Sequence, residues 1–90
     1  MYTALHHSCS NDHTQVSEFL LDNKADIDAR NGCGYTPLNI CNFMNTCKLL
    51  VQRRADLTAR GNDGTTPLKR AIQVKKSDIV AYLRSVGAPE

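Results

Sequence analysis

Cysteines and histidines are the side chains of this 90-residue chain that could bind a metal. They are Cys9, Cys33, Cys41 and Cys47, with His6, His7 and His13. A structural zinc site takes its ligands in close pairs such as C-x₂-C, and no two of these cysteines stand that close. We therefore expect no metal and no cofactor, with Cys9, Cys41 and Cys47 packed as small apolar side chains. Cys33 lies in a glycine-rich turn and is expected at the surface.

A nucleophilic site is suggested by Cys9, Asp12 and His13, which are the residue types of a catalytic triad. Asp12 and His13 fall in a polar break between two helical patterns, however, whereas Cys9 should point into the apolar interior. The glycine-rich segments GCGYTP and GNDGTTP precede helices but lack the Lys-Ser/Thr pair of a phosphate-binding loop. The sequence therefore predicts that the protein is not an enzyme.

The composition is typical of a soluble globular domain, with 41% hydrophobic and 22% charged residues. The net charge of +2 is too small to indicate a nucleic-acid partner. No apolar run approaches the ~20 residues that span a bilayer, and the N-terminus MYTALHHSCS does not have the pattern of a signal peptide. Without a signal peptide we expect the four cysteines to be reduced thiols and the protein to lie in the cytoplasm or the nucleus.

Three similar segments reveal an internal repeat. TALHHSCS begins at Thr3, TPLNICNF at Thr36 and TPLKRAIQ at Thr66, so the intervals are 33 residues from Thr3 to Thr36 and 30 from Thr36 to Thr66. A later series of leucines has these intervals in the reverse order; its members are Leu20, Leu50 and Leu83. Both series agree if the middle copy has lost three residues between Thr36 and Leu50.

Each copy has the signals of a helix pair followed by a turn. Thr-Pro-Leu starts a helix, because the threonine hydroxyl accepts an unpaired backbone N–H and proline is tolerated in the first turn. In the second helix of the first copy, Val16, Phe19 and Leu20 recur at the spacing of one buried face. The corresponding apolar residues of the third copy are Ile79, Val80, Leu83 and Val86. The segments ADIDARNGCG and ADLTARGNDG have the Gly, Asn and Asp content of hairpin turns.

Together these features resemble ankyrin repeats. The resemblance rests on Thr-Pro-Leu, the later leucines, the motif Ala-Asp-(Ile/Leu)-x-Ala-Arg and the turn glycine, at one period over nearly the whole chain. It implies an all-α solenoid of three helix-turn-helix units with short connecting β-hairpin loops. It divides a single domain, residues 1–90, into repeats 1–33, 34–63 and 64–90. It also implies a non-enzymatic scaffold that binds another protein.

Some positions depart from the ankyrin pattern. The histidine that usually follows the leucine is kept as His6 but is replaced by Asn39 and Lys69. The glycine that stops the second helix is Lys24 in the first copy and Arg54 in the second. A residue with a Cβ atom in that left-handed conformation costs roughly 1 kcal/mol. We therefore expect weaker local stability without a change of fold.

The resemblance places partner contacts at the hairpin tips and along the exposed side of each first helix. The residues there are Cys33, Tyr35, Phe43, Met44, Asn62, Asp63, Thr65, Arg70, Gln73 and Val74. Tyrosine, phenylalanine, methionine and arginine are the types that anchor interfaces. Two alternatives stay open: Tyr35 could pack along its own hairpin, and Phe43 and Met44 could turn inward as core residues.

The partner expected from the resemblance is another protein, bound by a monomer, with no nucleic acid and no membrane. A different class of function also stays open, in which the chain is a purely structural piece of a longer ankyrin array whose function lies elsewhere. The segment MYT starts inside the repeat pattern, without a preceding hairpin, which favours such a piece.

The shortened middle copy leads to a prediction about its helices. Three residues are about 0.8 of a helical turn, so their loss inside a rigid helix would rotate all that follows. We expect instead that the first helix of this copy ends near Phe43 and that Asn45 caps the next. That next helix would present Thr46 and Cys47 where the third copy has Ile79 and Val80, which makes the middle copy the weak point of the stack.

Overall fold

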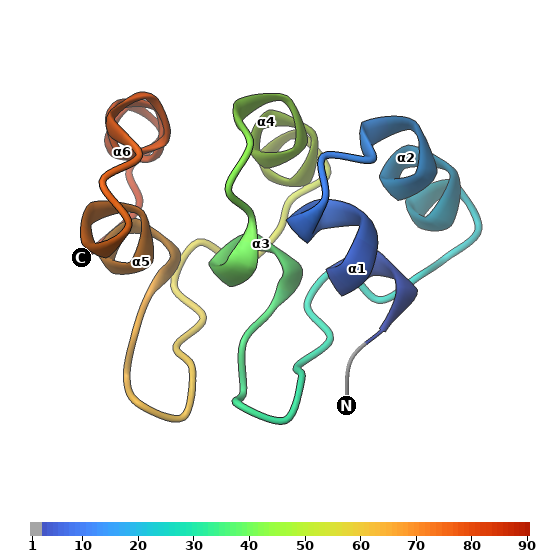
Figure 1. Cartoon of the computed structure of the whole chain (residues 1–90), viewed down its shortest axis with the longest axis horizontal. Helices are drawn as coiled ribbons and strands as arrows, with labels where there is room; N and C mark the ends of the chain where they lie inside the picture. Colours follow the sequence, from blue (N-terminus) through green and yellow to red (C-terminus); the bar gives the residue numbers. More distant parts are fainter. Residues whose placement is uncertain (1–2) are drawn as a thin grey trace.

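The computed structural model describes residues 3–90, which form three antiparallel helix pairs stacked in a row (Figure 1). The helices are α1 (Ala4–Ser10), α2 (Thr14–Asp22), α3 (Pro37–Ile40), α4 (Met44–Gln52), α5 (Pro67–Gln73) and α6 (Ser77–Ser85). The inner row is α1, α3 and α5, the outer row is α2, α4 and α6, and each helix packs against its neighbours in its own row. We call the pairs units 1, 2 and 3.

Two long connections project from one side of the stack (Figure 1). The first loop is residues 23–36 and the second loop is residues 53–66. Each contains a hairpin-like turn, in which the Asn31 N–H donates to the Tyr35 carbonyl and the Gly61 N–H to the Thr65 carbonyl. Neither turn is long enough to count as a strand, and the described residues contain helices and turns alone. The expected all-α architecture with short hairpin loops is confirmed.

The inner helices begin where the sequence predicted. In each, a threonine hydroxyl accepts the backbone N–H three residues on; the pairs are Thr3 with His6, Thr36 with Asn39 and Thr66 with Lys69. None of the helices in residues 3–90 has the length and apolar character needed to cross a bilayer.

Leucines and cysteines from both rows fill the core. Leu5, Leu50, Leu68 and Leu83 are each at most 2% exposed. Cys9, Cys41 and Cys47 are also buried and Cys33 is exposed, so the predicted placement of the four thiols is confirmed. Burial raises the pKa of the Cys47 thiol to about 12, mainly by desolvating the charged form. These core thiols are therefore protonated and behave as small apolar groups.

The deletion of three residues in unit 2 shortens α3, which has four residues where α1 and α5 have seven. The connection between the paired helices is three residues long in every unit: 11–13, 41–43 and 74–76. The prediction that the first helix ends near Phe43 is wrong, because α3 ends earlier, at Ile40. The prediction that Asn45 caps α4 is also wrong: Phe43 is the N-cap residue, without a side-chain bond, and Asn45 lies inside the helix.

Backbone conformation explains how the short helix is accommodated. In units 1 and 3 the connection turns through a left-handed residue, Asp12 at φ 58° or Lys75 at φ 60°. In unit 2 it is extended instead, with ψ 126° at Cys41 and 132° at Phe43. An extended residue advances about 3.3 Å, compared with about 1.5 Å in a helix. The extended connection therefore makes up the lost helical rise and delivers α4 into register between α2 and α6.

Two residues of the predicted buried face of α2 are exposed. Val16 is 49% exposed and Phe19 is 65% exposed, so the expectation that they are buried with Leu20 is wrong. The equivalent positions in the next unit, Thr46 and Leu49, are 0% and 7% exposed. The difference is that α4 packs against outer helices on both sides, α2 and α6, whereas α2 packs against α1 and, in the described outer row, against α4 on one side only.

Side chains from two inner helices bind each unit to the loop that follows it. His6, which is 0% exposed, donates from Nε2 to the Tyr35 carbonyl at 2.7 Å. Asn39, at the equivalent position of α3, donates from Nδ2 to the carbonyls of Ala59 and Thr65, each at 3.3 Å. Lys69 is the third residue in this series, and it is exposed. The polar residue after the leucine is therefore the link between successive units.

Replacing Asn39 by alanine tests this link. We expect Asn39→Ala to lower the free energy of unfolding by about 3 kcal/mol, because two buried carbonyls lose their donor. The measurement is urea-induced unfolding followed by circular dichroism. Lys69→Ala is the matched control and should change stability by less than about 0.5 kcal/mol. Equal effects of the two variants would contradict the assignment.

The outer helices end in the left-handed conformation that the sequence predicted. Lys24 and Arg54 each have φ 69°, where Gly87 has φ 86°. In all three cases the residue after the left-handed one donates its N–H back to a leucine carbonyl: Ala25 to Leu20, Ala55 to Leu50 and Ala88 to Leu83. This is the Schellman arrangement, which normally favours glycine.

Restoring glycine at these stops should stabilise the stack. We expect Lys24→Gly and Arg54→Gly each to raise the free energy of unfolding by roughly 0.5 to 1 kcal/mol, because the Cβ strain is removed. Arg54→Ala keeps a Cβ atom and serves as the control, with a change below about 0.5 kcal/mol. If Arg54→Ala stabilised as much as Arg54→Gly, the gain would come from the arginine side chain and not from the backbone.

Candidate functional site

Three of the residues expected at a partner surface meet in one cluster. Tyr35 comes from the first loop, Asp63 from the second loop and Arg70 from α5. The Tyr35 hydroxyl donates to Asp63 Oδ2 at 2.6 Å, and Arg70 Cζ lies 5.8 Å from the centre of the Tyr35 ring. We call Tyr35, Asp63 and Arg70 the tyrosine cluster. It lies where the projecting loops join the inner row of helices.

Glycine makes room for the tyrosine ring. A Cβ atom at Gly61 would overlap the ring of Tyr35, so the ring lies directly against the backbone of the second loop. Tyr35 therefore packs across to the next loop, and the alternative that it packs along its own hairpin is wrong. The backbone of Tyr35 is also held in place, because its carbonyl accepts the hydrogen bond from His6 Nε2.

Hydrogen bonding sets the charge state of the cluster. The hydrogen bond from Tyr35 lowers the pKa of Asp63, and bonds from the Thr65 hydroxyl and N–H lower it further. The same bond raises the pKa of Tyr35, because ionised Asp63 favours the protonated phenol. At neutral pH the pair is therefore a neutral donor and a charged acceptor, which is the strong form of this hydrogen bond.

The two loops that carry Tyr35 and Asp63 are also bonded to each other. The Asn62 N–H donates to the Cys33 carbonyl at 2.9 Å, and the Asp56 N–H donates to Asp28 Oδ1, also at 2.9 Å. Arg30 donates from Nη1 to the carbonyls of Gly34 and Arg60. Arg30 was not among the residues expected from the sequence to have a role, although its place in the repeated Ala-Arg motif is a signal of one.

The other expected contact residues divide between two ends of the inner helices. Near the loops, Cys33 and Asn62 are exposed. Thr65 is only 3% exposed and donates its N–H to Asp63 Oδ1, so it offers almost no surface to a partner. Near the connections between paired helices, Phe43, Gln73 and Val74 are exposed and Met44 is half-buried. Phe43 is therefore not a core residue. The structure brings together the loop group around the tyrosine cluster and leaves the second group at the opposite end.

Cys9, Asp12 and His13 do not share one accessible site, because Cys9 is buried and the other two are exposed. Cys9 is 0% exposed, and its Sγ lies 3.6 Å from the Ser17 hydroxyl. Burial raises the pKa of Cys9, which disfavours the thiolate that a nucleophile needs. Asp12 and His13 are exposed in the connection between α1 and α2. Within residues 3–90, no group of three or more His, Cys, Asp or Glu side chains lies close enough to hold a metal ion.

Comparison with protein families agrees with this geometry. A family model described as ankyrin repeats, in three copies, matches residues 1–60. The chain belongs to the ankyrin-repeat family. The matched residues include the helices of units 1 and 2, and unit 3 of this ankyrin-repeat protein forms the same helix pair beyond them. No curated protein matched the sequence. Ankyrin repeats are generally modules for protein–protein interaction and are typically not enzymes.

The tyrosine cluster can be tested by its titration. In Tyr35→Phe the donor to Asp63 is lost, so we expect the pKa of Asp63 to rise toward its usual value, measured by NMR of the carboxyl carbon. Because the folded pKa of Asp63 is depressed, its stabilising effect is present above the unfolded pKa and is lost as the pH falls through the folded pKa. Tyr35→Phe should therefore reduce the part of the pH dependence of the free energy of unfolding that Asp63 contributes.

Asp56 provides an internal control for this titration. Its pKa is also lowered, but the main cause is the hydrogen bonding of Thr58, whose hydroxyl donates to Asp56 Oδ1 at 2.7 Å. Tyr35→Phe should therefore leave the Asp56 titration unchanged. If both carboxyls titrated as before in the variant, the bond between Tyr35 and Asp63 would not exist in solution.

Proposed function

We propose that this ankyrin-repeat protein is a non-enzymatic module that binds another protein through its loop tips and inner helices. The observation that carries the proposal is the tyrosine cluster. It combines a tyrosine and an arginine, which dominate binding energy at interfaces, on a surface formed by two loops and a helix.

Preorganisation is the physical advantage of the cluster. The ring of Tyr35 is held by its hydrogen bond to Asp63 and by contact with Gly61. A side chain that is already ordered loses little rotamer entropy when a partner binds, so more of the contact energy appears as affinity. The hydrogen bonds between the two loops also restrict their backbones before a partner binds.

Arg70 supplies the polar part of the proposed contact. Among residues 3–90 it forms no ion pair and donates no side-chain hydrogen bond, although it lies over the Tyr35 ring. Its planar guanidinium group can donate to a carboxylate or to backbone carbonyls of a bound segment. A partner segment that presents an apolar side chain to Tyr35 and an acceptor to Arg70 would satisfy both.

A longer partner segment could continue along the inner row. Phe43 and Met44 lie where the connection from α3 enters α4, and Gln73 and Val74 lie at the end of α5. Phe43 and Val74 are each 37% exposed. We include these four residues in the proposed surface as its second, more apolar part. The short α3 contributes here, because its extended connection places Phe43 at the surface.

Alanine variants of the cluster test the proposal. Proteins captured from cell extract by the immobilised chain would be identified by quantitative mass spectrometry, and the affinity of each purified partner would be measured by calorimetry. We expect Tyr35→Ala combined with Arg70→Ala to weaken binding at least about tenfold, because two anchors are removed.

Lys48→Ala is the matched control. Lys48 Nζ lies 5.9 Å from the centre of the Tyr82 ring, so this variant also removes a cation from a tyrosine, but on the outer helices. It should leave partner affinity unchanged. If every captured partner bound the double variant as well as the parent chain, the cluster would not be the binding surface.

A further inference from the structure

Positive charge gathers on α5 and in the connection that follows it. Arg70 lies within α5, and Lys75 and Lys76 lie between α5 and α6. The ion pairs among residues 3–90 include none of these three cations. We call Arg70, Lys75 and Lys76 the basic set. Its charge is available to an anionic group from outside the molecule.

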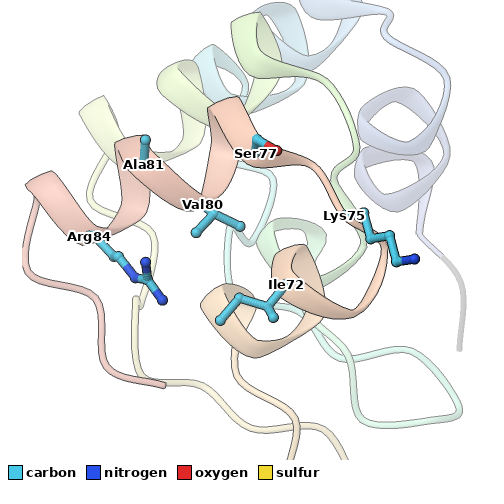
Figure 2. A pocket seen from close by; sticks show the side chains of 6 residues that line it. All are labelled: Ile72, Lys75, Ser77, Val80, Ala81 and Arg84. Atoms are coloured by element: carbon cyan, nitrogen blue, oxygen red, sulfur yellow. The ribbon is translucent and has the colours of Figure 1, made fainter.

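The connections between paired helices are open to solvent in more than one unit. Figure 2 shows that Lys75 points away from Ile72 and Val80, which face each other between α5 and α6. The whole connection 74–76 is exposed. The equivalent connection 11–13 of unit 1 is exposed too, although unit 2 packs against that unit. The two lysines are therefore exposed because of where they lie within a unit.

Carboxylates are missing from the inner row of helices. The segments α1, α3 and α5 contain no Asp or Glu. The carboxylates that flank the basic set already accept hydrogen bonds within the chain: Asp63 accepts from Tyr35 and Thr65, and Asp78 accepts from the Ile79 N–H. The inner side of unit 3 therefore has positive charge that the chain itself does not neutralise.

Apolar surface borders the basic set. Val74 and Phe43 are each 37% exposed, and they lie in the connections 74–76 and 41–43. These connections belong to neighbouring units, because α3 packs against α5 and α4 against α6. Val74 follows Arg70 by four residues, so the two lie on the same side of α5. A bound segment would therefore meet positive charge and apolar area next to each other.

We propose, on the basis of the proposed function, that the partner binds through an acidic segment in which a carboxylate side chain lies two residues from an apolar one. The carboxylate contacts Arg70, and the apolar side chain contacts Val74 and Phe43. Further carboxylates contact Lys75 and Lys76. An extended segment places side chains two residues apart on one side at ~6.6 Å, which matches the ~6 Å rise of four helical residues from Arg70 to Val74.

A protein segment fits this surface better than a nucleic acid does. The two loops carry Asp26, Asp28, Asp56 and Asp63, which would repel a phosphate backbone that runs along the stack. The net charge of +2 is also small for a nucleic-acid partner. A short peptide can instead place its carboxylates at α5 alone and its apolar side chains on the neighbouring apolar surface.

Short random peptides displayed on phage and selected on the immobilised chain test the proposal. We expect the selected peptides to be enriched at least about twofold in Asp and Glu, with an apolar residue two positions away. The tightest of them would be synthesised and its affinity measured by fluorescence anisotropy. Replacing its Asp and Glu by Asn and Gln should weaken binding at least about tenfold. Added salt should weaken the acidic peptide more than this neutral version.

Neutralising the basic set gives the decisive comparison. In the variant that combines Arg70→Gln, Lys75→Gln and Lys76→Gln, the acidic and the neutral peptide should bind equally well. The reason is that the coupling between opposite charges is lost when either partner is neutral. Circular dichroism would verify that the variant is folded.

Three cations of the outer row provide the matched control. Lys24→Gln, Lys48→Gln and Arg54→Gln together remove the same charge from exposed positions, and Lys24 and Arg54 share the left-handed backbone of Lys75. This variant should keep the preference for the acidic peptide. If it lost the preference as the first variant does, the effect would come from net charge and the proposal would fail.

Other outcomes separate the acidic segment from the binding function itself. Selected peptides that are not acidic, but whose binding is lost in Tyr35→Ala, would contradict the acidic segment and leave the binding module in place. A preference for the acidic peptide that survives neutralisation of the basic set would do the same. If no peptide were selected, or if the chain bound a single-stranded DNA oligonucleotide in place of peptides, both proposals would be overturned.

Discussion

The stack depends on the hydrogen bonds that one polar side chain in each of the first two units makes to the backbone of the following loop. His6 bonds the Tyr35 carbonyl, and Asn39 bonds those of Ala59 and Thr65. Loops of this length carry many backbone groups that need partners, and a buried carbonyl without a donor is costly. These bonds meet that need and at the same time fix where each loop lies relative to the preceding helix pair. The positions of Tyr35 and Asp63 follow from this.

The proposed function is a consequence of the same arrangement. Because neighbouring loops are bonded to each other and to the inner helices, side chains distant in sequence are held at fixed separations on one surface. Tyr35, Asp63 and Arg70 form such a set, with a donor, a charged acceptor and a guanidinium group that lies over the tyrosine ring. A rigid surface of this kind suits recognition, whereas the buried thiols of the core have no access to substrate and a raised pKa.

The shortened unit shows how a repeat tolerates a deletion. Neighbouring outer helices hold α4 in place, so the loss cannot be passed on as a rotation of everything that follows. The deletion is accommodated inside unit 2, where α3 is one turn shorter and the connection to α4 is extended. The remaining cost is local, since fewer apolar residues of α3 face the core, and Phe43 comes to lie at the surface.

The sequence by itself determined the family, the starts of the inner helices, the left-handed stops at Lys24 and Arg54, and the burial of three cysteines. These features depend on signals within a few residues, or on a period that all three copies share. Only the tertiary structure decided that Tyr35 packs on Gly61, that α3 ends at Ile40 and that Phe19 is exposed. Each of these depends on what lies beside the residue in space. An apolar helical face is buried only where a neighbouring unit covers it, and a deletion is absorbed where the distance to the next helix can still be spanned.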